Sequence, residues 1–311
     1  MSKRADHISE CLELAILLEA SAHKPGNVSV VTNFENTRYE HFLASAVAAR
    51  PSLEYAAERG IAVHERKIRA ADVGVGQIIK DCVADIDLWQ HGGNTLLGTV
   101  ILLAPIAVAA GMTPSQDDLG TNLRKNMKIV IESTTPEDAV NVYETMKIAK
   151  PSGLGKAPKL DINDPESTKR IVEEKITLFR VFQIAEEYDT ICSEWVNNYP
   201  ITFDLAYPFL TELIEKRDDL NQAIIHTFLK VLAACPDTFI ARKTSLETAK
   251  EVSSEAGEIL SLGGLETNEG RQRLTEFDAK LRRSGNLLNP GTTADIVAAA
   301  LAICTLRGYR P

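Results

Sequence analysis

The stretch from Gly92 to Gly111 constrains the fold more than any other part of the chain. Between Leu96 and Ala110 every residue except Gly98 and Thr99 carries an apolar side chain. A helix that is apolar on every face has to be surrounded by other elements. The sequence therefore predicts a buried central helix at about residues 94–110, with other helices packed around it.

A second stretch near the end of the sequence has the same character. From Thr292 to Leu306 most residues are Ala, Leu or Ile, and Asn289-Pro290-Gly291 precedes them. This pattern predicts a second buried helix over about 292–306. Helical periodicity recurs almost everywhere else, no linker rich in Pro, Gly and Ser divides the chain, and no repeat is visible. We therefore expect a single-domain, all-α multi-helix bundle over residues 1–311, with both buried helices at its centre.

Local signals place several boundaries. Thr135-Pro136-Glu137-Asp138 and Asp164-Pro165-Glu166 are typical helix starts. We expect Thr37–Glu40 to form a capping box and Pro51 to start a second short helix that ends at Gly60. Other expectations are one extended piece at 28–34, a long helix over 171–195 interrupted at 188–190, and a helix from Thr238 to Gly263. The loop from Pro151 to Asp164 is long enough to suggest a functional role.

Charge and targeting signals limit the function classes. The chain has 43 acidic and 34 basic residues, a formal charge of −9, which argues against binding to nucleic acid or an anionic membrane. Five scattered cysteines and a polar segment at 1–10 favour a reduced, soluble protein of the cytoplasm. The histidines lack metal-ligand spacing, so a zinc site is not expected. A homodimer is expected only because homodimers are the commonest oligomers among soluble proteins.

Four turns share one pattern, in which Gly or Pro is accompanied by Asn or Thr, often with an acid or base beside it. These turns are Lys24-Pro25-Gly26-Asn27, Gly92-Gly93-Asn94-Thr95, Pro236-Asp237-Thr238 and Asn289-Pro290-Gly291-Thr292-Thr293. Unpaired N–H groups at helix starts attract anions. If the turns converge, they form a phosphate cradle with Lys24, Arg242 and Lys243, and Glu19, Asp237 and Asp295 can hold Mg²⁺ against it.

Each of these residues also has a structural interpretation. Asp295 follows Thr292 by three residues, as the acid of a capping box does, and Asp237 is placed like an ordinary N-cap. Lys24, Arg242 and Lys243 are surface charges in most proteins. Glu19 lies near the negative end of an apolar helix and Asp189 interrupts a helical pattern, so a functional role is as plausible for these two as a structural one.

Taken together, these segments resemble the triphosphoribosyl-dephospho-CoA synthase family along nearly the whole chain. The segments that carry the resemblance are Glu19 with 24–28, 42–46, Gly93-Asn94-Thr95 with Gly98, 236–238 and 289–295. By resemblance, the chain is all-helical and transfers the triphosphoribosyl group of ATP to a ribose hydroxyl of dephospho-CoA, with release of adenine. Its partners are then small nucleotide or phosphate-bearing substrates.

The resemblance also suggests roles for individual residues. Glu19, Asp189 and Asp295 are expected to act in catalysis, and Glu19, Asp237 and Asp295 to bind Mg²⁺. Ligand and phosphate contacts are expected from Lys24, Asn27, Asn94, Thr95, Arg242, Lys243, Asn289, Gly291 and Thr292.

Two alternatives stay open. Asn36-Thr37-Arg38-Tyr39 and Leu96-Leu97 depart from the family pattern, which has His-x-Asp-Met and a basic pair there. The first alternative is a related enzyme of tetrahydromethanopterin-type cofactor synthesis. The segments 151–155 and 240–243 look more like the branch of the family that is found in archaea and methylotrophs and associated with that synthesis. The second alternative is a non-catalytic helical scaffold, which would be favoured if the four turns were scattered over the surface.

Overall fold

The computed structural model describes residues 2–114, 119–154, 157, 159–216 and 219–311. Within these ranges the chain is helical, with no strand. No helix in this part of the chain has both the length and the apolar character needed to cross a membrane. The α-helices are α1 (Lys3–Ser21), α2 (Tyr39–His64), α3 (Val75–Trp89), α4 (Leu97–Met112), α5 (Leu119–Glu132), α6 (Pro136–Ala149), α7 (Pro165–Glu173), α8 (Leu178–Ala185), α9 (Thr190–Val196), α10 (Tyr207–Lys216), α11 (Leu220–Ala234), α12 (Thr238–Lys243), α13 (Leu246–Ser261), α14 (Asn268–Arg282) and α15 (Gly291–Leu306).

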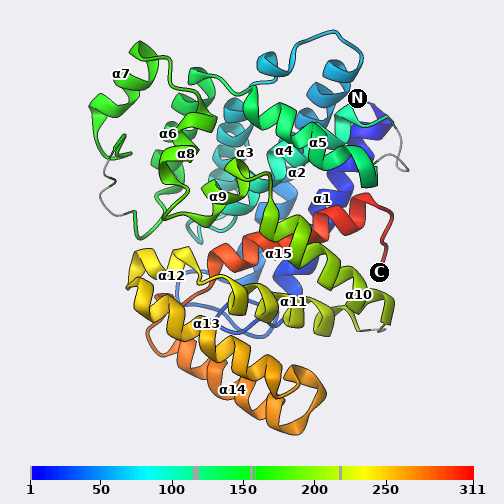
Figure 1. Ribbon diagram of the computed structural model, residues 1–311, viewed down its shortest axis with the longest axis vertical. Coiled ribbons are helices and arrows are strands. Elements are labelled where there is room, and N and C mark those ends of the chain that lie inside the picture. The colour runs from blue at the N-terminus through cyan, green and yellow to red at the C-terminus, as the bar shows by residue number, and fades with distance from the viewer. Residues whose placement is uncertain (1, 115–118, 155–156, 158, 217–218) are drawn as a thin grey trace.

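The two buried helices predicted from the sequence are α4 and α15. Every residue of α4 except Gly98 is buried, and so are nearly all residues of α15. Both lie in the middle of the molecule, with α12, α13 and α14 at one end and α7 at the other (Figure 1). One hydrophobic core runs from α1 to α15, because two helices without a polar face need neighbours on all sides.

Glycines allow α2 and α4 to cross in close backbone contact. A Cβ atom on Gly60 would overlap the carbonyl oxygen of Val108, and one on Gly111 would overlap that of Ala57. Close approach of two backbones is a position where only glycine fits. This crossing fixes α4 against α2, the helix with which α4 has its most extensive contact.

Pro51 does not start a new helix, as the sequence led us to expect. It lies inside α2, which continues past Gly60 to His64. An internal proline frees the carbonyl four residues earlier, here that of Val47, whose side chain is exposed. Water can satisfy that carbonyl, so the helix tolerates the proline. The N-cap is Arg38, and the hydroxyl of Thr37 instead donates to the carbonyl of Gly92 at 2.7 Å.

Three other expected boundaries were wrong. Residues 28–34 form a tight turn with one bridge between Ser29 and Thr32 instead of an extended piece. The helix expected over 171–195 breaks at 186–189, close to the expected interruption, and also at 174–177, because the hydroxyl of Thr177 caps α8. In the same way Ser245 caps α13 and separates it from α12. Hydroxyl side chains before apolar runs favour such caps over helix continuation.

The predicted start of α6 is confirmed and ties this helix to α3. The carboxylate of Asp138 accepts hydrogen bonds from the backbone N–H of Gly76 at 2.8 Å and from the N–H and hydroxyl of Thr135 at 2.7 and 2.8 Å. The start of α7 is also as predicted, since Asp164 accepts from the N–H of Glu166.

We expect Asp138→Ala to lower the free energy of unfolding by about 3 kcal/mol, because one buried and two half-buried donors lose their acceptor. Glu137→Ala is the matched control, since Glu137 is the exposed acid beside Asp138. Urea denaturation measures both variants. Equal stability of the two variants would contradict this account of the α3–α6 contact.

Candidate active site

Three of the four turns line a single cavity of about 620 Å³. Lys24 and Asn27, the segment 92–95, and Asn289 with Gly291 and Thr292 all reach it. The fourth turn, 236–238, borders it through Thr238, whose hydroxyl is 3.3 Å from that of Thr292. The turns therefore converge. Turns scattered over the surface would have favoured a scaffold.

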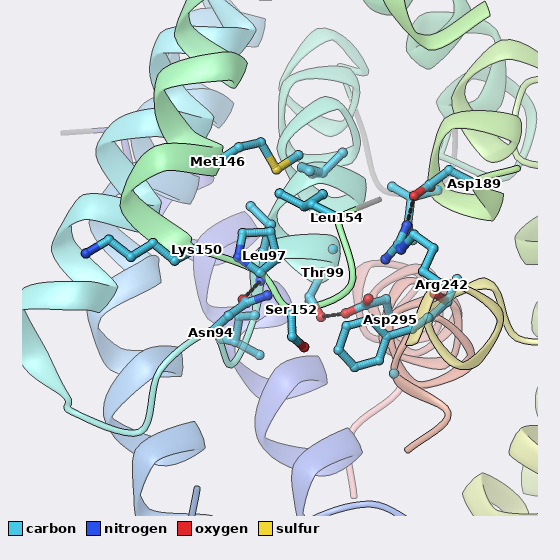
Figure 2. Close-up of a pocket in the computed structure, with 18 of the residues that line it drawn as sticks. Asn94, Leu97, Thr99, Met146, Lys150, Ser152, Leu154, Asp189, Arg242 and Asp295 are labelled. Carbon is cyan, nitrogen blue, oxygen red and sulfur yellow. Dashed lines mark hydrogen bonds and ion pairs between the residues drawn. The ribbon is translucent and has the colours of Figure 1, made fainter. Parts of the chain in front are cut away.

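Asp295 lies on the polar wall of this cavity, which we define as Glu19, Lys24, Asn27, Thr99, Asn289 and Asp295. Its Oδ1 atom accepts a hydrogen bond of 2.6 Å from the hydroxyl of Thr99, as Figure 2 shows. A Cβ atom on Gly98 would overlap its Oδ2 atom. The carboxyl group thus points away from α15 and packs against the first turn of α4, so the capping-box interpretation of Asp295 was wrong.

The surroundings of Asp295 favour its protonated form. Burial raises its pKa to about 8; the negative charges of Glu19 and Asp237 add to this effect, and the hydrogen bonds from Thr99 oppose it. At neutral pH the carboxyl group therefore holds a proton. Perturbed carboxyl groups in a cavity are typical of catalytic acids.

Glu19 and Lys24 form a buried ion pair at the end of α1. The Nζ atom of Lys24 lies 3.0 Å from Oε1 of Glu19, and it donates to the carbonyls of Glu19 and of Ala22, the latter at 3.1 Å. An ammonium group has three protons; two are donated to these carbonyls, and Oε1 of Glu19 is paired with the group by charge without a hydrogen bond. The carbonyls left free at a helix C-terminus attract such a cation. Lys24 lines the cavity but is buried and paired with Glu19, so its expected phosphate contact stays a prediction. Burial raises the pKa of Glu19, and Lys24 opposes the shift.

Asp237 has a structural role and does not line the cavity. Its Oδ1 atom accepts from the N–H groups of Phe239 and Ile240, and its Oδ2 atom accepts from the N–H and hydroxyl of Thr293. Two carboxylate oxygens have about four acceptor positions, and all are taken. The metal role expected for Asp237 therefore does not fit, and its N-cap interpretation is confirmed.

The expected Mg²⁺ ligands do not form a ready-made site. Glu19 is paired with Lys24, Asp237 is fully hydrogen-bonded, and Asp295 is the one expected ligand that faces the cavity without a cation beside it. Across the part of the chain that the structure describes, no group of three or more His, Cys, Asp or Glu residues could hold a metal ion.

Arg242 and Asp189 form an ion pair in the lining of the cavity, with the carboxylate at the start of α9 and the guanidinium on α12 (Figure 2). Asp189 also caps α9 by accepting from the N–H of Cys192 at 3.1 Å, which explains why it interrupts the helical pattern. Lys243 does not line the cavity, because its ammonium group lies 3.9 Å from the centre of the Phe239 ring and donates to the carbonyl of Asn286. Burial lowers the pKa of Lys243 to about 8. Its expected phosphate contact does not fit this position.

We expect Arg242→Met and Asp189→Asn to show a coupling of about 1 kcal/mol in free energy of unfolding. Methionine keeps much of the arginine stem and asparagine remains a good N-cap, so the pair of substitutions isolates the charge interaction. Chemical denaturation of both single variants and the double variant measures it. Strictly additive losses would show that the ion pair contributes nothing to stability.

The other expected ligand residues differ in their availability. Asn27 donates from Nδ2 to Oδ1 of Asn289 at 3.0 Å, and both line the cavity. Asn94 accepts from the N–H of Leu97 at 3.1 Å, so it also caps α4. The hydroxyl of Thr95 is 2.7 Å from that of Ser45. Gly291 lines the cavity at a place where a Cβ atom would meet the ring of Phe239 at 2.8 Å.

An apolar wall of the same cavity was missed in the sequence. We define it as Leu97, Met146, Leu154, Val181, Phe182 and Ala185, all of which line the cavity. Figure 2 shows Met146 and Leu154 gathered near Leu97. Leu154 belongs to the long loop expected to be functional, of which Gly155 lies outside the described residues. Thr99 was also missed, although it is the one hydroxyl in the apolar stretch of α4.

Comparison with known proteins points to one family. A family model described as ATP:dephospho-CoA triphosphoribosyl transferase matches residues 5–311. The 2-(5''-triphosphoribosyl)-3'-dephosphocoenzyme-A synthase of Klebsiella pneumoniae is 32% identical over 93 residues, which is 30% of each chain. A Vibrio cholerae protein named as a probable synthase of the same kind is 23% identical over 231 residues, 70% of each chain.

A solved structure shares the fold. The crystal structure of a candidate triphosphoribosyl-dephospho-CoA synthase from Archaeoglobus fulgidus aligns with a TM-score of 0.63 and 22% identity. The alignment covers 86% of this chain and all of the other.

Proposed function

The chain belongs to the ATP:dephospho-CoA triphosphoribosyl transferase family, and on this premise we propose that it transfers the triphosphoribosyl group of ATP to a ribose hydroxyl of dephospho-CoA and releases adenine. The observation that carries the proposal is the position of Asp295. This carboxyl group lines the same cavity as three of the four turns, and no cation of the described residues is paired with it.

The reaction needs one proton donor and one proton acceptor. The bond between the anomeric carbon and the adenine nitrogen breaks, and a bond from that carbon to the acceptor oxygen forms. Adenine leaves with the electron pair of the broken bond. We assign Asp295 as the acid that protonates the leaving base, because its pKa of about 8 keeps it protonated at neutral pH.

Glu19 is suited to the other half of the reaction. Burial raises the pKa of its carboxyl group, which makes the carboxylate a stronger base, and the ammonium group of Lys24 held against it opposes this shift and favours the charged form. We assign it as the group that takes the proton of the attacking hydroxyl and faces the positive charge that develops on the sugar. The proton then returns to Asp295 by exchange, so that the protein is unchanged over one turnover.

Mg²⁺ enters this proposal with the substrate. Mg²⁺ commonly binds through substrate phosphates and keeps several water molecules, so a ready-made protein site is not required. We propose that ATP binds as its Mg²⁺ complex and that the triphosphate carries the ion. Removal of Mg²⁺ by a chelator is then expected to weaken ATP binding without affecting the binding of adenosine.

The maximal rate is expected to fall as the pH rises through about 8. The acid that protonates adenine must be in its protonated form, and the pKa of Asp295 in the free protein is about 8. The rate of adenine release at saturating substrates, measured from pH 6 to pH 9.5, checks this. A rate that rises over the same range would show that Asp295 acts as a base.

Incubation with Mg²⁺, ATP and dephospho-CoA tests the proposed function directly. Chromatography is expected to show free adenine and a ribosylated acceptor in equal amounts. Omission of dephospho-CoA is the control for simple hydrolysis. No adenine, together with binding of a pterin-type precursor, would favour the tetrahydromethanopterin-related alternative. Binding of no nucleotide or precursor at all would favour a scaffold.

A further inference from the structure

The apolar wall takes no part in the chemistry proposed above. It comes from α4, α6, α8 and the loop after α6; Leu97, Val181 and Phe182 are buried, and the other three side chains are half-buried. Phe182 is held by a T-shaped contact with Trp195, with 4.9 Å between ring centroids. Trp195 in turn donates from its ring nitrogen to the carbonyl of Ile101 at 3.1 Å. The ring of Phe182 is therefore fixed in place before any ligand arrives.

Two of the polar groups beside this wall, those of Tyr143 and Cys192, are uncharged, and the nearby charges of Asp189 and Arg242 are paired with each other. The hydroxyl of Tyr143 donates to the carbonyl of Leu160 at 2.5 Å, and burial raises its pKa. Burial also raises the pKa of the Cys192 thiol well above its usual value, so the thiol stays neutral. A wall of this kind favours an uncharged, flat or apolar group over a phosphate.

The cations that line the cavity fall into two groups, those with a carboxylate partner and those that are exposed. Among the described lining residues, Lys24 and Arg242 are the cations that are not exposed, and both already have carboxylate partners. The other lysines, Lys150 and Lys159, are exposed. They stand at the mouth of the cavity, which we define by the exposed residues Asn94, Lys150, Ser152, Lys159, Tyr188 and Asn286. Uncommitted positive charge is thus found at the mouth.

We propose that the apolar wall binds the purine base of the nucleotide donor and that the donor's phosphates extend to the mouth. This orientation rests on the proposed function, and it places the ring beside Phe182 and Met146. The base then lies in the same cavity as Asp295, whose proton it takes when it leaves. The triphosphate adds contacts with exposed lysines, which contribute little to binding at ordinary salt.

Binding measurements with the separate halves of ATP test this orientation. The probes are adenine, adenosine, ATP and inorganic tripolyphosphate, and calorimetry gives their affinities. Adenosine is expected to bind within about tenfold of ATP, and tripolyphosphate is expected to fail to displace adenine. Tripolyphosphate that binds more tightly than adenosine would overturn the proposal. In a Trp89→Phe variant, Trp195 is the single tryptophan, and its fluorescence is expected to change with adenine but not with tripolyphosphate.

Two substitutions in the wall sharpen the test. Ala185→Leu fills the wall with an apolar group, and Met146→Lys places a cation there. Each is expected to weaken adenine binding by about tenfold or more. Ala234→Leu at the exposed end of α11 is the matched control and should leave binding unchanged. If phosphates occupied the wall, Met146→Lys would instead tighten the binding of tripolyphosphate.

The two proposals fail in different ways. Adenine binding needs no acceptor and no turnover, so it reports on the wall alone. Adenine binding that both wall variants leave intact overturns the orientation, even if ATP and dephospho-CoA still react. Wall variants that weaken adenine binding in a protein without transferase activity would support the base site and reject the reaction.

Discussion

Replacing Asp295 with asparagine is expected to lower the rate of adenine release by about a thousandfold. A positioned general acid typically contributes a factor of this size. Asparagine keeps the shape of the side chain and an oxygen that can accept from Thr99, but it cannot protonate the leaving base. The free energy of unfolding should therefore change by less than about 1 kcal/mol.

Single-turnover measurements with saturating Mg²⁺ and ATP separate this loss from a loss of binding. Asp219→Asn is the matched control, because Asp219 caps α11 away from the cavity and asparagine is an equally good N-cap. That variant should keep full activity. If Asp295→Asn retained most of the rate, Asp295 would be a structural anchor for the start of α4 and another group would be the acid.

Replacing Gly60 with alanine is expected to lower the free energy of unfolding by about 3 kcal/mol or more. The added methyl group would overlap the carbonyl oxygen of Val108, and backbone in a buried helix cannot move aside as a flexible side chain can. The two helices would have to separate, which leaves the core around α4 poorly packed.

Gly257→Ala makes the prediction specific to this crossing. Gly257 lies within α13, and a Cβ atom there would be at an ordinary 3.7 Å from Cβ of Ala233. The control variant should gain up to about 1 kcal/mol, because alanine favours a helix over glycine. Guanidinium denaturation of both variants measures the difference. Equal stability of the two would mean that the α2–α4 contact is less tight than the structure shows.

The central helices could be predicted from the sequence because their burial depends only on the residues of the helix itself. A run such as Leu96–Ala110 has no polar face, so burial follows from composition alone. Helix starts with a side-chain cap, such as Thr135, were predicted for the same reason. Pro51 was misjudged because tolerance of an internal proline depends on what surrounds the freed carbonyl, which only the packed structure reveals.

The candidate site could be predicted in outline only. The turns converge because they flank helices that pack around the same core, so their common pattern was informative. The role of each charged residue was not predictable. Lys24 donates hydrogen bonds to carbonyls at the end of α1, and Arg242 pairs with Asp189, which is 53 positions away in the sequence. The apolar wall could not be recognised, because residues such as Phe182 and Met146 look like ordinary core positions of an amphipathic helix.

The contact between Thr99 and Asp295 also bears on the order of events during synthesis. The two residues are 196 positions apart, and Asp295 is on the last helix. Chains fold from the N-terminal side as they leave the ribosome, and contacts of such long separation form late. A nascent chain can therefore assemble most of the cavity before it acquires the acid. Until α15 docks, α4 also lacks one of its covering neighbours, so the step that completes the site is the step that removes an aggregation-prone surface.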